Sequence, residues 1–150
     1  MKINKSLFIV LIFIQLSCNS QQEKINGISF VASRDAINTK HISPVIKAHV
    51  NFVALMPFGF IKDVSSPKIN YNTDRQWFGE TKKGLSQYAK IFQDEQIKIM
   101  VKPQIWVWKG EYTGLIEMNS EEKWRLLENT YSEFILTYAK AAQDLKADVL

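Results

Sequence analysis

The fold class follows from residues 81–103, TKKGLSQYAKIFQDEQIKIMVKP. Apolar residues between Leu85 and Phe92 recur at i, i+3, i+4 and i+7, which predicts a helix over residues 81–95 with one buried face. Residues 97–101 then form a short apolar run that ends at a Lys-Pro pair, as expected for a strand buried on both faces. A helix that leads into such a strand within a residue or two is typical of an α/β protein with a parallel sheet.

The same alternation extends to both sides of this stretch. The expected elements are a strand at 25–31, a short helix capped at Ser43-Pro44 and reaching His49, a strand at 52–56, the helix and strand above, a long helix capped by Asn119 with Glu122, and a fourth strand that starts at 147–150. Strict alternation of strands and helices predicts parallel strands with helical crossovers.

Two architectures fit this order, the closed barrel and the doubly wound open sheet. An open nucleotide-binding sheet usually has a Gly-rich turn after its first strand, whereas residues 31–34 read Val-Ala-Ser-Arg. The barrel is therefore favoured. A complete (β/α)8 TIM barrel takes about 250 residues and eight strands. We expect residues 25–150 to form its N-terminal part, truncated at the fourth strand.

The first residues predict export. Lys2 and Lys5 precede an unbroken apolar run from Leu7 to Ile14, which is too short to span a membrane and is typical of a signal peptide. Ser17-Cys18 resembles a bacterial lipobox, although Gln15 stands where leucine is usual. We expect a signal peptide over 1–18 and a tether over 19–24. The mature protein is expected in the cell envelope, attached to the membrane by lipid on Cys18. The alternative is a plain signal peptide with Cys18 in the cleaved part.

Composition excludes several other classes of function. The net charge of +4 falls by two when Lys2 and Lys5 leave with the signal, and the remaining basic residues are scattered, which argues against nucleic acid as a partner. Cys18 is the only cysteine, so neither an intrachain disulfide nor a Cys-rich metal site is expected. His41 and His49 are eight residues apart and are predicted to be surface or packing residues. No metal and no cofactor are expected.

The expected site lies in the loops that follow the strands, where barrel enzymes place their active sites. The loops at 58–80 and 104–118 are long, and they contain Trp77, Trp106 and Trp108. A glycan cleft pairs flat aromatic side chains with polar groups for the hydroxyl edge of the sugar. Candidate edge partners are Lys102 and Gln104, with Asn70, Asn72, Arg75 and Glu80 nearby. Alternatively, the three tryptophans only pack the loops onto the barrel rim, while Trp124, in the first turn of a helix, is expected in the core.

Several motifs in this order resemble glycoside hydrolase family 113, and the resemblance covers about residues 27–150. They are Gly79-Glu80-Thr81, the run from Met100 to Trp106, Tyr112-Thr113-Gly114, and Glu121-Glu122-Lys123-Trp124 followed by Tyr131 and Tyr138-Ala139. The version here looks like the lipoproteins of Bacteroidetes-type bacteria. The family contains β-1,4-mannanases.

The resemblance implies a retaining mechanism with two glutamates, an acid/base after the fourth strand and a nucleophile after the seventh. Both would fall after Leu150, so no catalytic residue is expected within the chain, and neither Glu80 nor Glu111 is assigned the role. The resulting hypothesis is a glycosidase that acts on a β-linked polysaccharide, here a fragment without its catalytic pair. The alternatives are a non-catalytic glycan-binding envelope lipoprotein and a purely structural barrel lipoprotein.

Overall fold

The computed structural model of the protein describes residues 24–150. The predicted signal peptide, Cys18 and all of the tether except Lys24 lie outside these residues. Within residues 24–150, no helix is both long enough and apolar enough to cross a membrane.

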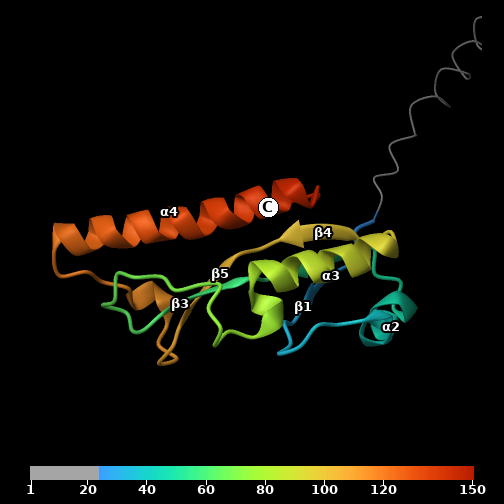
Figure 1. Ribbon diagram of the computed structural model, residues 1–150, viewed down its shortest axis with the longest axis horizontal. Helices are drawn as coiled ribbons and strands as arrows, with labels where there is room; N and C mark the ends of the chain where they lie inside the picture. Colours follow the sequence, from blue (N-terminus) through green and yellow to red (C-terminus); the bar gives the residue numbers. More distant parts are fainter. Residues whose placement is uncertain (1–23) are drawn as a thin grey trace, which may run out of the picture.

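The core of the fold is a three-stranded parallel sheet with the order β1-β2-β4 (Figure 1). Its strands are β1 (Gly27–Phe30), β2 (Phe52–Leu55) and β4 (Lys98–Val101), which confirms the three strands predicted from the sequence. Next to β4, Val149 forms a single parallel bridge with Met100. The predicted fourth strand is therefore present as one bridge, on the side of β4 that a sequentially ordered barrel requires.

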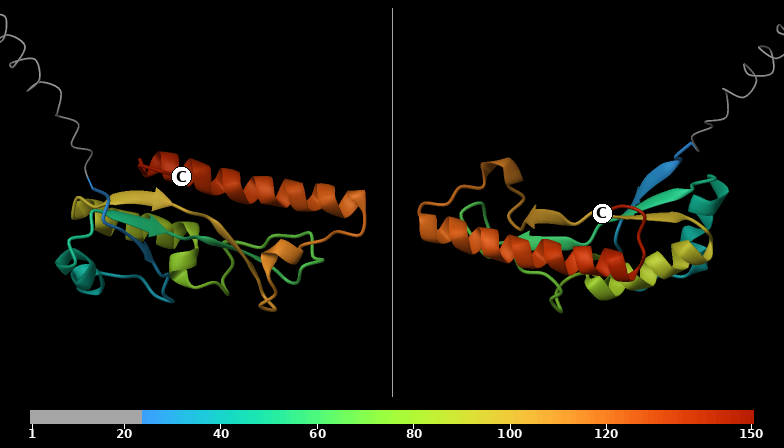
Figure 2. Two further views of the ribbon diagram at one scale, coloured as in Figure 1. Left: turned by 180° about the vertical axis from the view of Figure 1, so that it is seen from behind. Right: turned by 90° about the horizontal axis from the view of Figure 1, so that it is seen from above.

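Helices flank this sheet (Figure 2). They are α2 (Thr39–Lys47), α3 (Lys82–Asp94) and α4 (Glu121–Asp144), with short 3₁₀ turns η1 (Phe78–Glu80) and η2 (Thr113–Leu115). Both α3 and α4 contact β4. Thr81 caps α3, and the predicted buried stripe is confirmed because Leu85, Tyr88, Ala89 and Phe92 are almost fully buried.

Side chains alternate between the two faces of the sheet, as strand geometry requires. Val53, Leu55, Ile99 and Val101 are buried against the helices. The residues between them, including Phe52, Ala54, Met56 and Met100, are only partly buried. In a closed barrel this second face points toward the barrel axis.

The two loops predicted after β2 and β4 each begin with a further strand, so their predicted starts were wrong. β3 (Phe58–Ile61) and β5 (Gln104–Val107) pair in parallel as a second, two-stranded sheet. Phe52 pairs with Lys98 and Phe58 with Gln104, an offset of 46 residues in both sheets. Pro57 and Pro103 interrupt the ladder because proline has no N–H to donate. The pairing continues because the N–H of Gln104 still donates to the carbonyl of Pro57 at 2.9 Å.

Two helix starts also differ from the prediction. α2 begins after Asn38, whose side chain accepts from the N–H of Lys40, so that Ser43 is not the cap and Pro44 lies inside the helix. The ring of His41 completes this cap by accepting from the N–H of Asn38 at 3.0 Å, a role the sequence did not suggest. α4 is capped by Ser120 and not by the neighbouring Asn119.

The burial of the aromatic residues of α4 agrees only in part with the prediction. Phe134 and Tyr138 are fully buried, as the predicted stripe required. Trp124 is only partly buried and is not part of the hydrophobic core, so its predicted place there was wrong. Tyr131, on the same predicted stripe, is 48% exposed.

Candidate functional site

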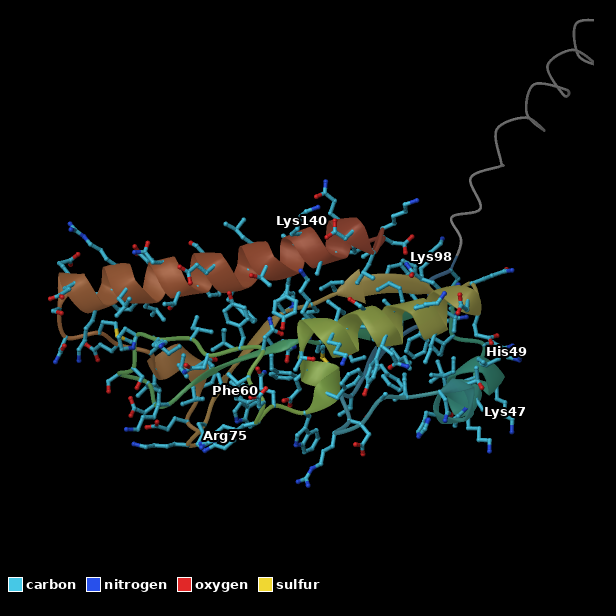
Figure 3. All side chains as sticks on the ribbon, in the orientation of Figure 1. Lys47, His49, Phe60, Arg75, Lys98 and Lys140 are labelled. Carbon is cyan, nitrogen blue, oxygen red and sulfur yellow. The ribbon has the colours of Figure 1, made fainter. Side chains whose placement is uncertain are left out.

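A cleft of about 1060 Å³ lies on the side of β3 and β5 that faces away from α4. Its wall comes from the carboxyl ends of β1 and β2, from β3 and β5, and from the segment 70–80 before α3. Figure 3 shows two of its residues, Phe60 and Arg75, close together on the side of the molecule opposite α4. The cleft thus lies where the strands end, as expected for a barrel site.

Strand alternation produces the aromatic floor of the cleft. Phe58 and Phe60 on β3 and Trp106 on β5 line the cleft, whereas the intervening Gly59 and Val107 are buried on the opposite side. The rings of Phe58 and Phe60 stack with centroids 6.0 Å apart, and Trp108 meets Phe60 edge-on at 5.6 Å. Trp106 is 53% exposed and Trp108 69%. Large aromatic faces are therefore open to solvent in a concave surface.

Trp77 faces the cleft from the segment before α3, and three contacts hold this segment in place. The guanidinium of Arg34 lies over the Trp77 ring at 5.4 Å from its centroid. The backbone N–H of Trp77 donates to Oε2 of Glu80 at 3.1 Å. The side chain of Gln76 donates to the carbonyl of Phe58 at 2.9 Å, which ties the segment to β3. Together with Phe58, Phe60, Trp106 and Trp108, Trp77 forms what we call the aromatic cleft.

Glu80 is a partly buried carboxyl on the wall of this cleft. Burial raises the pKa of its side chain, and the N–H of Trp77 opposes that shift by favouring the charged form. Beneath it, the single hydroxyl proton of Tyr138 on α4 is shared between Oδ1 of Asn72 at 3.1 Å and the carbonyl of Glu80 at 3.4 Å. Burial above all raises the pKa of Tyr138 well beyond its usual range, which keeps the hydroxyl protonated as a donor. The wall of the cleft is thus tied to the core through α4.

The sequence-predicted site residues divide into two groups. Trp77, Trp106 and Trp108 line the aromatic cleft together, and so do Asn70, Arg75 and Glu80 among the proposed edge partners. Lys102 and Gln104 are not among its lining residues; Lys102 lies at the break between the two sheets and Gln104 at the first position of β5. Asn72 is engaged by the N–H of Lys82 and by Tyr138.

Sequence reasoning missed Phe58, Phe60, Asp74 and Gln76 as lining residues. The alternation of Phe58-Gly59-Phe60-Ile61 was the available signal, hidden by the assumption that Pro57 ended the strand. Glu111 is exposed and does not line the cleft. Among residues 24–150, no three His, Cys, Asp or Glu side chains gather closely enough to hold a metal ion.

Comparison with known protein families identifies one match. The sequence profile described as Glycoside Hydrolase Family 113 matches residues 31–150. The chain belongs to glycoside hydrolase family 113. No curated protein matches it. The profile covers every element from the end of β1 onward, including all the strands and loops that build the aromatic cleft.

Solved structures of family 113 proteins share the fold. The GH113 β-mannanase AaManA from Alicyclobacillus acidocaldarius, in complex with ManMIm, superposes with a TM-score of 0.70 at 21% identity, over 83% of this chain and 42% of that one. A GH113 β-1,4-mannanase gives 0.66 at 14% identity, over 83% and 43% of the two chains. A complex of a GH113 β-1,4-mannanase gives 0.68 at 13%, over 86% and 45%. The chain thus spans less than half the length of these proteins.

The parallel strands and alternating helices therefore match family 113 TIM-barrel proteins over most of the chain. At these identities the likeness establishes the fold. What the aromatic cleft binds has to be argued from its own side chains.

Proposed function

We propose that this chain supplies part of the glycan-binding surface of a β-mannanase-like glycoside hydrolase that acts on a β-linked polysaccharide, a mannan. The observation that carries the proposal is the aromatic cleft, in which Trp77, Trp106 and Trp108 present partly exposed rings to one concave surface. Membership of family 113 supports the reaction class, and the neighbouring structures, named as β-mannanases, support the sugar.

The chemistry of the cleft suits a polysaccharide. A hexose has a face of C–H groups that packs on aromatic rings, and hydroxyls at its edge that need hydrogen-bonding partners. Trp106 lies on β5 and Trp108 directly follows its end, so the two offer successive aromatic surfaces. Asn70, Arg75 and Glu80 line the same cleft and offer donors and acceptors for the edge.

The reaction we propose is hydrolysis with retention by two glutamates that lie outside residues 24–150. Retaining enzymes hold two carboxyls about 5–5.5 Å apart, one as nucleophile and one as acid/base. The family resemblance assigns both roles to later positions, so we assign neither to Glu80, whose Oε2 accepts a hydrogen bond from the N–H of Trp77. Glu111 is a poor candidate because it is exposed and away from the cleft. We therefore propose that residues 24–150 bind glycan without cleaving it and that the rest of the barrel completes the catalytic site.

We also propose that the protein is anchored in the cell envelope by lipid on Cys18. The support is the apolar run from Leu7 to Ile14 and the lipobox-like Ser17-Cys18 that follows it. Such an anchor would hold the cleft close to polysaccharides outside the cytoplasm.

The test uses the full-length protein, by which we mean this chain together with the rest of the proposed barrel. Its hydrolysis of β-1,4-mannan is measured, with β-1,4-glucan and β-1,4-xylan as comparison substrates. We expect release of reducing ends from mannan, and the first product should have the β configuration by proton NMR. The same assay on residues 24–150 should give no turnover. Binding of mannan by the full-length protein without any turnover would establish the non-catalytic glycan-binding alternative. The proposal would be contradicted if the protein neither bound nor hydrolysed any of the three polysaccharides.

A further inference from the structure

A second pocket of about 740 Å³ adjoins the aromatic cleft. Thr73, Asp74 and Gln76 line both, so the same short segment borders the two pockets. The outer part of the second pocket is formed by Arg34 and by the first turns of α3. Nothing in the proposed mannan site described above accounts for this pocket.

The second pocket is lined by three cations and one carboxylate. Arg34, Lys82 and Lys83 carry the positive charges, and Asp74 is the only acidic residue of its lining. Among the described residues, none of these three cations forms an ion pair. Arg34 instead lies over the ring of Trp77 in the neighbouring cleft. We call Arg34, Lys82 and Lys83, with the pocket they line, the cationic pocket.

The two lysines stand where the helix dipole disfavours positive charge. Both are exposed in the first turn of α3, which has no acidic residue. A helix N-terminus carries a partial positive charge, so cations there are unfavourable for the helix, typically by about 0.3–1 kcal/mol. The two lysines therefore concentrate positive charge beside the cleft at a small cost in helix stability. An anion in the pocket would offset that cost.

We propose that the cationic pocket binds a carboxylate carried by the same glycan whose backbone lies in the aromatic cleft. The inference rests on the proposed function and narrows the substrate to an acidic, uronate-bearing β-linked polysaccharide. The shared segment places the two pockets side by side. Arg34 lines the second pocket while its guanidinium lies over Trp77 of the aromatic cleft. Asp74 lines both regions, but in the aromatic cleft it and Glu80 balance the charges of Lys62 and Arg75. In the cationic pocket three cations face Asp74 alone, so the excess positive charge favours a carboxylate there.

The experiment compares two probes that differ only in charge, β-1,4-mannan and the same mannan oxidised to carboxylate at a fraction of its C6 hydroxyls. The affinity of the full-length protein for each is measured by calorimetry, and the readout is the ratio of the two affinities. We expect the oxidised mannan to bind more tightly at low salt, and the preference to weaken as salt screens the charges. The variant Lys82→Gln/Lys83→Gln should lower the ratio about fivefold or more.

The matched control is Lys40→Gln/Lys47→Gln, which removes the same charge from α2. Figure 3 shows Lys47 near one end of the molecule, well apart from Arg75 of the aromatic cleft. This variant should leave the ratio unchanged. A ratio that responds equally to both variants would mean a general charge effect and would overturn the inference. So would binding of inorganic phosphate by Lys82 and Lys83 with no preference for oxidised mannan, since the pocket would then take a free anion.

Failure of the proposed function gives a different result. If neither mannan binds, the aromatic cleft is not a glycan site and the inference falls with it. If the neutral mannan binds as well as the oxidised one in both the parent protein and the lysine variant, only the acidic-substituent inference fails.

Discussion

Among single residues, the tryptophans divide into those exposed for binding and those held by packing. The sequence placed Trp77, Trp106 and Trp108 on one rim because long loops after parallel strands converge there. It could not show that Phe58 and Phe60 form the floor between them, since that depends on the parallel pairing of β3 with β5. It also overestimated the burial of Trp124, because helical spacing gives a face but not how far the core extends beneath it.

The first prediction concerns Trp106 and Trp108. In the full-length protein, Trp106→Ala and Trp108→Ala should each weaken binding of β-1,4-mannohexaose about tenfold, since each removes one aromatic contact of ~1.4 kcal/mol. Their melting temperatures should change little because both rings are more than half exposed. Trp124→Ala, the matched control, should leave the affinity unchanged. Lower melting points with unaltered affinity would identify Trp106 and Trp108 as packing residues.

The second prediction uses Glu80, whose pKa burial raises above its ordinary value of 4.5. The folded state then holds the proton more tightly than the unfolded state, so the stability this group contributes is present below pH 4.5 and is lost as pH rises through the raised pKa. Glu80→Gln keeps an acceptor for the N–H of Trp77 without a charge. Urea titration gives the free energy of unfolding of the variant and of the parent. The variant's value minus the parent's should therefore increase between about pH 4 and about pH 7.

Glu111→Gln is the control for this experiment, because it removes an exposed carboxyl away from the cleft. A difference between Glu80→Gln and the parent that stays constant with pH, or shrinks as pH rises, would contradict the assigned burial of Glu80.

At the scale of elements, sequence periodicity predicted β2, α3 and β4 because each buries a regular set of apolar residues. It failed where a proline stands inside a ladder. Pro57 and Pro103 lie opposite each other, and the carbonyl groups around them still accept, so pairing resumes in the same register. Helix starts were displaced for a similar local reason, since Asn119 and Ser120 are both good caps and only tertiary packing decides between them.

The third prediction concerns the packing of α4 on β3. A Cβ at Gly59 would lie 2.7 Å from Ile69, 2.9 Å from Ile105 and 3.0 Å from Phe134 of α4. Gly59→Ala should therefore lower the free energy of unfolding by about 1–3 kcal/mol, the usual cost of overpacking. Gly27→Ala is the control on another strand, because its nearest neighbour would be at an ordinary 3.6 Å. Equal stability of the two variants would contradict the close packing of α4 on β3.

At the scale of the whole molecule, strand order and helical crossovers made the barrel half predictable, and the match to family 113 structures agrees with it. The signal and lipid anchor rest on residues 1–18, outside the described residues. The identity of the sugar could not be read from the sequence, since stacking surfaces accept any hexose with a suitable C–H face. The cationic pocket was equally hidden, because Arg34 and Lys82-Lys83 are distant in sequence and meet only through the fold.

The fourth prediction concerns location. Expressed in a bacterium with lipoprotein processing, the protein should fractionate with membranes, and Cys18→Ala should release it or leave it unprocessed. The measurement is immunoblotting of membrane and soluble fractions. Identical fractionation of parent and variant would contradict lipidation at Cys18.

Binding of glycan in the aromatic cleft can be tested by NMR. The indole N–H signals of the full-length protein are followed during titration with β-1,4-mannohexaose. Signals are assigned by substituting each tryptophan in turn. We expect saturable shifts for Trp77, Trp106 and Trp108, whose rings line the cleft, and none for Trp124 on α4. Saturable binding that leaves all three cleft tryptophans unshifted would place the glycan elsewhere and contradict the account.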